Sequence, residues 1–243
     1  MPVHALQKDR ERKEEPMRHK FHELVFFRHG ESLANVASIR AQKGDFSVIE
    51  RLRNTPSREV PLTRRGVATS RALGEMHSVF SDADAFFVSE YVRAKETAHH
   101  SNFTQAWKVD RRLNERDWGM IDHVTPQERE ALAPEWKRAK ERSPYRWRPL
   151  NGETLMEKKF AIANFLDELS SHGAARIVVV SHGEAIQAAR TELEHIPEHI
   201  FAERERDMRM DNCDGVHYRY SERSLWMRML PFGGTPTKWE LVR

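Results

Sequence analysis

Two short apolar segments that each end in a His-Gly step constrain the fold of this chain more than any other feature. The first spans residues 24–27 and continues into Arg28-His29-Gly30, and the second spans residues 175–180 and continues into Ser181-His182-Gly183. Runs of this length, rich in β-branched or aromatic residues, are typical of buried strands. Because the residues after each glycine can begin a helix, we predict two strand–turn–helix units.

Strands and helices are expected to alternate along the rest of the chain. Helices are predicted near residues 31–42, 64–79, 91–99, 126–142, 154–171 and 183–194, further strands near 84–88 and 105–109, and a hairpin from 217–220 and 225–228. Such alternation is typical of an α/β fold whose mostly parallel sheet is covered by helices on both faces. The predicted architecture is a three-layer α/β/α sandwich.

The two His-Gly steps are predicted to lie at a place where ligands bind. Ligands of open α/β sheets bind at the carboxyl ends of strands, and helix N-termini offer free N–H groups to anions. Arg28 and His29 therefore lie where a phosphate is expected. A single histidine after a strand is more often structural, but a second copy at His182 is hard to explain by packing and could place two imidazoles in one crevice.

Further motifs follow the first step in a fixed order. They are Pro61-Leu62-Thr63-Arg64-Arg65-Gly66, the segment from Ser89 to Ala98, the segment from Leu113 to Gly119, and Gly152-Glu153-Thr154. Together with the two His-Gly steps, this series resembles the histidine phosphatase superfamily, which contains cofactor-dependent phosphoglycerate mutases and many phosphomonoesterases. The resemblance runs from about Phe21 to near Val216 and implies a phosphoglycerate mutase-like fold.

The resemblance also implies roles for individual residues around a phosphate. His29 would attack phosphorus through a neutral ring nitrogen, while its other nitrogen donates to a backbone carbonyl. Arg28 and Arg93 would bind the phosphate, because guanidinium is a permanently charged fork of donors. His182 would donate to a phosphate oxygen. The remaining residues implied in binding are Asn35, through its amide, and Gly183.

Glu115 is the residue that the resemblance implies as general acid. A carboxylic acid facing the phosphate could protonate the leaving alkoxide and recover a proton from the water that hydrolyses phosphohistidine. The alternative for Glu115 is an ordinary surface ion pair with Arg112 or Arg116.

We expect no resident cofactor or metal, since the chemistry implied above needs none. Cys213 is the single cysteine of 243 residues, and the 40 basic and 37 acidic residues give a formal charge of +3. We find no spacing of zinc or calcium ligands, no membrane-spanning run and no apolar block of a secretory signal. We therefore expect a cytoplasmic protein that binds a small phosphorylated substrate and neither nucleic acid nor membrane. The sequence does not predict an oligomeric state.

The chain is expected to contain one catalytic domain and one extension. Residues 1–20 are charged and aperiodic, which predicts a solvated extension that can be disordered. Residues 21–243 would form the catalytic domain, with excursions near 40–60 and 114–150 as walls of the site. The second excursion holds a basic and aromatic stretch, 136–148, which we interpret as a lid selecting an anionic substrate rather than a surface for single-stranded nucleic acid.

Three functions agree with these motifs. A phosphomonoesterase is favoured over a cofactor-dependent phosphoglycerate mutase because the sequence departs from the mutase pattern. The segment from Trp118 to His123 lacks the mutase continuation, and Glu184 stands where mutases usually carry an amide. Ser89-Glu90 also replaces the Ser-Pro step of the family. The third function, a non-catalytic phospho-binding or scaffolding role, is disfavoured because the expected catalytic set is intact.

Overall fold

The computed structural model describes residues 21–104, 106–221 and 224–242, and the extension predicted at 1–20 lies outside them. The strands are β1 (Glu23–Arg28), β2 (Ala85–Val88), β3 (Trp107–Val109), β4 (Arg176–Ser181), β5 (Gly215–Ser221), β6 (Ser224–Leu230) and β7 (Glu240–Leu241). They form one sheet in the order β3-β2-β4-β1-β5-β6-β7. The first four are mutually parallel, whereas β5, β6 and β7 pair in antiparallel fashion. The predicted α/β class and parallel core are confirmed.

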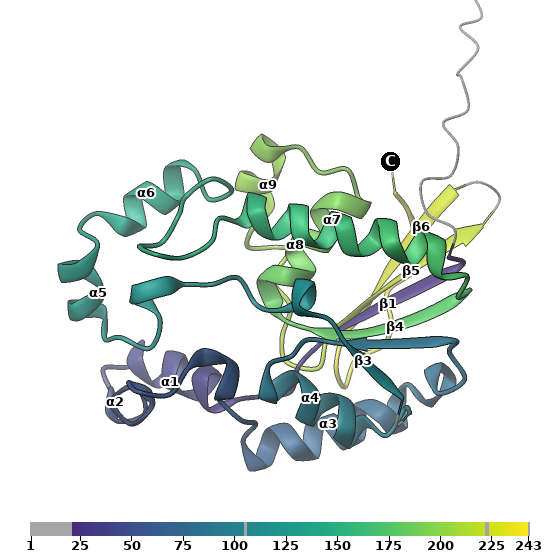
Figure 1. The fold of residues 1–243 in the computed structure, drawn as a ribbon, viewed down its shortest axis with the longest axis horizontal. Helices are drawn as coiled ribbons and strands as arrows, with labels where there is room; N and C mark the ends of the chain where they lie inside the picture. The colour runs from purple at the N-terminus through teal and green to yellow at the C-terminus, as the bar shows by residue number, and fades with distance from the viewer. Residues whose placement is uncertain (1–20, 105, 222–223, 243) are drawn as a thin grey trace, which may run out of the picture.

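Helices cover both faces of this sheet (Figure 1). They are α1 (Leu33–Ala41), α2 (Ser47–Leu52), α3 (Arg64–Met76), α4 (Val92–Ser101), α5 (Pro126–Leu132), α6 (Trp136–Arg142), α7 (Leu155–His172), α8 (Gly183–Leu193) and α9 (Glu198–Arg204), with 3-10 turns η1 (Ser57–Glu59), η2 (Ser78–Phe80), η3 (Arg111–Leu113) and η4 (Gly119–Ile121). Helices α3 and α4 lie on one face, and α7 and α8 lie on the other. The three-layer architecture is therefore confirmed.

Strand β1 is apolar because it packs on both helical layers. Leu24 and Phe26 belong to the core cluster that contains the apolar residues of α7 and α8. Val25 and Phe27 belong to the opposite cluster, which contains Leu73 of α3 and apolar residues of α4. Since side chains alternate between the faces of a strand, a strand covered on both sides reads as a continuous apolar run.

The structure corrects the prediction of one helix over 126–142. That segment forms α5 and α6, separated at Ala133-Pro134-Glu135, where Glu135 has a φ of 58°. Proline disfavours helical geometry in the residue before it, so the first helix ends there. Helices α2 and α9 and strand β7 were not predicted, and each is too short to carry a clear periodic pattern.

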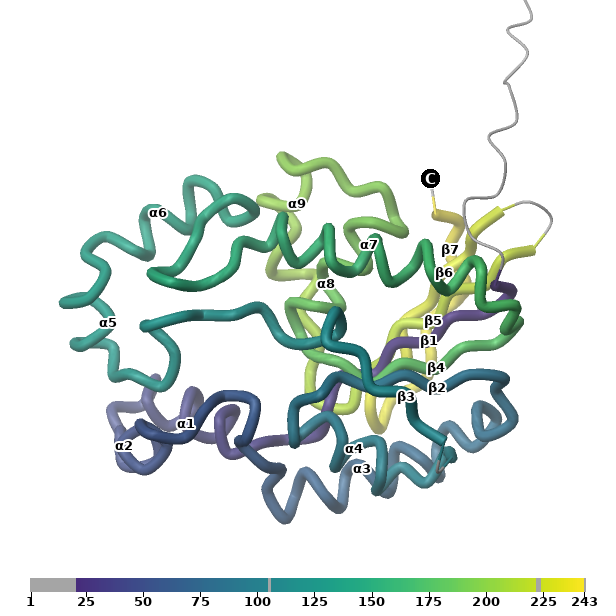
Figure 2. Tube along the Cα trace, viewed as in Figure 1, coloured from purple at the N-terminus to yellow at the C-terminus, as the bar shows by residue number. Residues whose placement is uncertain are grey.

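The two predicted excursions fold toward each other beyond the sheet. The first holds α2 and η1, the second holds η4, α5 and α6, and Figure 2 shows α2 and α5 on the same side of the molecule. Arg53 pairs with Glu128 at 2.5 Å, and Nδ1 of His123 donates to the carbonyl of Thr55 at 3.3 Å. No helix in the described ranges combines the length and apolarity needed to cross a membrane.

Candidate active site

The register of β1 and β4 brings the two predicted histidines together. Arg28 lies opposite Ser181 in the parallel ladder, so His29 and His182 each follow the last paired residue of their strand. The backbone N–H of His29 donates to the Ser181 carbonyl at 3.0 Å. The imidazole centroids are 5.0 Å apart, and both side chains are buried. The two imidazoles expected to converge therefore lie side by side at the carboxyl edge of the sheet.

The hydrogen bonds of His29 define its tautomer. Nδ1 lies 2.7 Å from the Gly30 carbonyl, which can only accept, so Nδ1 carries the proton. Nε2 accepts from the Nε–H of Arg93 at 3.2 Å and thus presents a lone pair. Burial, assisted by the nearby charges of Arg93 and Arg28, holds the pKa of His29 well below 6.5. The ring is accordingly neutral at neutral pH.

Two buried guanidiniums border the histidine pair. Arg93, from the first turn of α4, also donates through Nη1 to the Ser57 carbonyl at 2.6 Å, and its guanidinium lies 4.8 Å from the centre of the Tyr91 ring. Arg28 donates to the Met210 carbonyl, but its Nε is buried without a hydrogen-bond partner in the described ranges. An unmet buried donor beside a second cation is a feature that favours an anionic ligand.

A chain of hydrogen bonds fixes the second histidine. Nε2 of His182 lies 2.8 Å from the Ser89 hydroxyl, which donates to Oδ1 of Asn114 at 2.9 Å. The Asn114 amide is itself oriented by Glu90, whose N–H donates to Oδ1 and whose carboxylate accepts from Nδ2. His182 therefore donates through Nε2, while its buried Nδ1 has no partner in the described part of the chain. Burial lowers its pKa well below 6.5.

Glu115 is held by backbone donors rather than by an arginine side chain. Its Oε1 accepts from the N–H of Arg116 at 3.0 Å and from the N–H of Glu184 at 3.1 Å. The predicted alternative, a surface ion pair, is wrong, because Arg112 pairs with Asp110 and Arg116 lies beside Glu184. Oε1 is committed to these donors, which leaves Oε2 as the oxygen that can carry and transfer a proton.

Comparison with known sequences decides the family. Residues 24–230 match the sequence profile of the histidine phosphatase superfamily, branch 1. The chain belongs to this superfamily.

Proteins similar to this chain include a mutase, by sequence, and two phosphatases, by fold. The chain is 28% identical over 188 residues to the 2,3-bisphosphoglycerate-dependent phosphoglycerate mutase 2 of Gloeobacter violaceus, covering 73% of this chain and 78% of that protein. The fold is similar to that of the α-ribazole phosphatase of Shigella flexneri (TM-score 0.68, 22% identity, 89% of this chain and 99% of that one). It is also similar to a mycobacterial glucosyl-3-phosphoglycerate phosphatase (TM-score 0.67, 20% identity, 88% and 100%).

Asn35 of this histidine phosphatase superfamily member lies in the first turn of α1. Its Oδ1 accepts from the backbone and hydroxyl of Ser32, both at 3.0 Å, and from Nδ2 of Asn212 at 3.2 Å. This leaves the Asn35 Nδ2 as the end able to donate to a ligand. Asn212 also donates to the His29 carbonyl at 2.9 Å. Sequence reasoning missed the contacts of Asn212, Ser57 and the Glu90–Asn114 pair. Glu90 and Asn114 stand in the motif segments described above, whereas Ser57 and Asn212 stand in no motif.

Glycines let the backbone approach closely at two points of the site. A Cβ at Gly30 would lie 2.7 Å from the Gly66 carbonyl, so the turn after β1 can pack on α3 only with glycine there. Gly183 opens α8 between the proposed acid and a cation. A Cβ there would lie 3.7 Å from Nε of Arg28 and 3.9 Å from Oε2 of Glu115, which places this helix start within reach of both.

A buried ion pair supports the Glu115 segment. The Arg116 side chain is almost fully buried, with Nε 3.0 Å from Oε2 of Glu184, and its guanidinium lies 4.7 Å and 5.5 Å from the ring centres of Trp118 and Trp147. The indole N–H of Trp118 donates to the same Glu184 oxygen at 3.0 Å. Burial raises the pKa of Glu184. Because Arg116 and Glu184 both donate backbone N–H groups to Glu115, their side-chain pairing fixes the position of that carboxyl group.

Proposed function

We propose that this protein is a phosphomonoesterase that hydrolyses small phosphorylated substrates through a phosphohistidine on His29. The observation that carries this proposal is the hydrogen bond from Arg93 to Nε2 of His29. It supports a neutral imidazole whose lone pair faces the position of a phosphate between two guanidiniums. His182, Asn35 and the N-terminus of α8 at Gly183 would bind the remaining oxygens.

The first proposed step forms the covalent intermediate. Nε2 of His29 attacks phosphorus in line, the ester P–O bond breaks, and Glu115 transfers a proton from Oε2 to the departing alkoxide. In the second step, water attacks phosphorus, Glu115 accepts a proton from that water, the P–N bond breaks, and inorganic phosphate leaves. The charge on the equatorial oxygens is spread over Arg28 and Arg93 in both steps.

Phosphoglycerate mutase activity is the second candidate, since one relative has that activity. The carboxyl group of Glu184 argues against it. A mutase must hold a second acidic group of its substrate near the reacting centre. The backbone N–H of Glu184 donates to Glu115, so the Glu184 carboxyl group lies near that centre and disfavours a second acidic group there. A scaffolding role is disfavoured because the histidines and guanidiniums remain assembled.

Phosphate trapping tests the proposal. Wild type mixed with a labelled phosphoester and quenched should carry acid-labile, base-stable phosphate, and His29→Ala should carry none and release no inorganic phosphate. Label on a serine would contradict the mechanism. Isomerisation of 3-phosphoglycerate with a bisphosphate primer that outpaces phosphate release would favour the mutase instead. Activity should survive a chelator, because no proposed step uses a metal, and cell fractionation tests the expected cytoplasmic location.

A further inference from the structure

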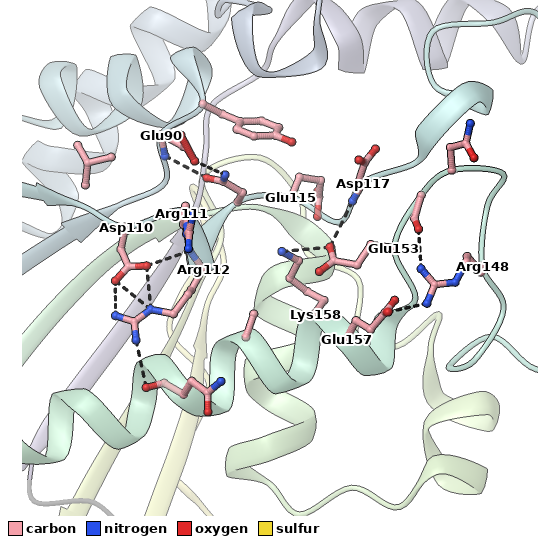
Figure 3. Close-up of a pocket in the computed structure, with 17 residues that line it drawn as sticks. Glu90, Asp110, Arg111, Arg112, Glu115, Asp117, Arg148, Glu153, Glu157 and Lys158 are labelled. Atoms are coloured by element: carbon pink, nitrogen blue, oxygen red, sulfur yellow. Dashed lines mark hydrogen bonds and ion pairs between the residues drawn. The ribbon is translucent and has the colours of Figure 1, made fainter.

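Two cavities flank the segment that carries Glu115, and they differ in chemistry. One, of about 1050 Å³, contains Glu115 and Tyr91 and extends to α7 (Figure 3). The other, of about 480 Å³, lies between α1 and the α5–α6 excursion. The smaller volume is within the usual range for a small-molecule site. Both cavities lie near the Glu115 segment, so we consider each as the space for the rest of a substrate whose phosphate binds at His29.

The larger cavity is lined by charges that already pair with one another. Its lining includes four cations, Arg111, Arg112, Arg148 and Lys158, and six acids, Glu90, Asp110, Glu115, Asp117, Glu153 and Glu157. Figure 3 shows Arg112 on Asp110, Arg148 on Glu157 and Lys158 on Glu153. Three of the four cations are paired and acidic groups are in excess, which disfavours an anionic substrate there.

The smaller cavity has an apolar and aromatic part and a polar part, and the polar part includes Asp122, Arg129 and Glu130. Helix α1 contributes a face of small side chains, and Ile49 and Trp118 close two sides. Trp136 of α6 lies on the opposite side, tilted against Trp147 at a centroid distance of 6.1 Å. Walls of small aliphatic groups and indole rings suit a flat, mainly apolar molecule.

One cation in this cavity has an unmet hydrogen bond. Nε of Arg129 is buried without a partner in the described ranges, and the Arg129 guanidinium lies 5.2 Å from the centre of the Trp136 ring. A buried donor without a partner costs free energy, which a ligand acceptor can recover. A carboxylate suits this position because it forms charge-assisted bonds with guanidinium.

The smaller cavity is linked to the catalytic centre through three contacts. Ala34, which lines it, precedes Asn35. Trp118 donates to Glu184, whose N–H in turn holds Glu115. His123 contacts the carbonyl of Thr55, in the same excursion that places the Ser57 carbonyl on Arg93. These contacts tie residues of the cavity lining to residues that position the catalytic groups.

We propose that the cavity between α1 and α5–α6 binds the leaving group of the substrate, and that this leaving group is an aromatic alcohol with a carboxylate at its far end. The ring would lie between α1 and Trp136, and the carboxylate would bond to Arg129. This inference rests on the proposed phosphatase function, because it places the phosphate at His29.

Three substrates and a set of variants test the proposal by kcat/KM for phosphate release. The substrates are 4-carboxyphenyl phosphate, phenyl phosphate and glycerol 3-phosphate. In Arg129→Gln, the loss should be about tenfold greater for 4-carboxyphenyl phosphate than for phenyl phosphate. Arg129→Lys should restore part of this difference in kcat/KM. Trp136→Ala should lower kcat/KM for both aromatic substrates relative to kcat/KM for glycerol 3-phosphate. Arg148→Gln, in the larger cavity, is the matched control and should not discriminate.

Binding to the inactive His29→Ala protein separates this inference from the proposed function. Calorimetry should show that adding Arg129→Gln to this protein weakens the binding of 4-carboxyphenyl phosphate about tenfold more than the binding of phenyl phosphate. Equal effects on the two esters, or discrimination by Arg148→Gln instead, would overturn the leaving-group assignment. If the binding difference appears while wild type releases no phosphate, the cavity assignment stands and the phosphatase function fails.

Discussion

The side chain of Arg93 donates its Nε–H to Nε2 of His29, the ring nitrogen proposed to attack phosphorus. The same guanidinium is tied to the Ser57 carbonyl through Nη1. A phosphate oxygen would compete for the Nε–H and free the lone pair for attack. Lysine keeps the charge but cannot make both bonds. We expect Arg93→Lys to lower kcat/KM about 100-fold, by analogy with the loss of one preorganised donor, with unchanged circular dichroism.

The position of Glu115 predicts a dependence on the leaving group. Because Oε1 is held by two backbone N–H groups, proton transfer should come from Oε2. General acid catalysis contributes roughly 10²–10⁴-fold when the leaving group is a poor one. Glu115→Gln should therefore slow hydrolysis of an alkyl phosphate by that range and affect 4-nitrophenyl phosphate far less. Steady-state kinetics with both esters checks this, and equal losses would remove Glu115 from the role of acid.

The tautomer of His182 predicts proton uptake when an anion binds. Its Nε2–H is committed to Ser89, and burial keeps its pKa well below 6.5, so Nδ1 is unprotonated at neutral pH. A phosphate beside Nδ1 favours the charged imidazolium and raises that pKa. Binding of vanadate or phosphate near pH 6.5 should therefore take up a proton, measured by calorimetry in buffers of different ionisation enthalpy. His182→Gln should abolish the uptake, and uptake that persists in this variant would assign it elsewhere.

The buried pair Arg116–Glu184 predicts a strong coupling between two mutations. Removing one partner of a buried ion pair typically costs about 3–5 kcal/mol, because the other charge stays buried and uncompensated. Glu184→Gln and Arg116→Met should each destabilise the protein in urea unfolding, whereas the double variant should lose less than the sum. Additive losses would show that the two side chains act independently. Lys159→Gln, which removes a cation paired with Glu192, is a milder control away from Glu184.

The paired histidines could be predicted from sequence because burial on both faces fixes β1 and β4 firmly. Each strand is apolar at every inner position, so a slip in register would move charged end residues such as Arg28 into the core. Sequence alone does not fix the order of the strands, but where β1 and β4 pair, the His-Gly steps end side by side. Helix starts are set by local chemistry too, since the side chains of Ser32 and Thr63 cap α1 and α3.

Contacts supplied by loops could not be predicted in the same way. Ser57 reaches Arg93 and Asn212 reaches the His29 carbonyl only because distant segments pack on the site. Neither residue stands in a periodic pattern or a local motif, so the sequence carries no signal of its position. The Asn114–Glu90 pair is similar, because it joins the ends of β2 and η3 after the sheet has formed.

Buried histidines also predict how stability depends on pH. His217 of β5 lies under Trp239 and beside Phe80, and burial lowers its pKa to about 4, although Glu23 opposes the shift. In the unfolded chain, the pKa returns to about 6.5. Between these two pKa values, His217 of the unfolded chain binds a proton that the folded protein does not bind. The contribution of His217 to the free energy of unfolding is therefore fully present above pH 6.5 and is lost as pH falls toward 4.

The expected slope is about 1.4 kcal/mol per pH unit for each such histidine, and His29 and His182 act in the same direction. Urea unfolding at pH 7.5, 6.5, 5.5 and 5.0 measures this slope before most carboxylates titrate. His217→Gln can lower stability at every pH, but it should also flatten the dependence, because glutamine does not take up a proton. An unchanged slope in that variant would show that His217 is protonated in the folded protein, with Glu23 outweighing the effect of burial.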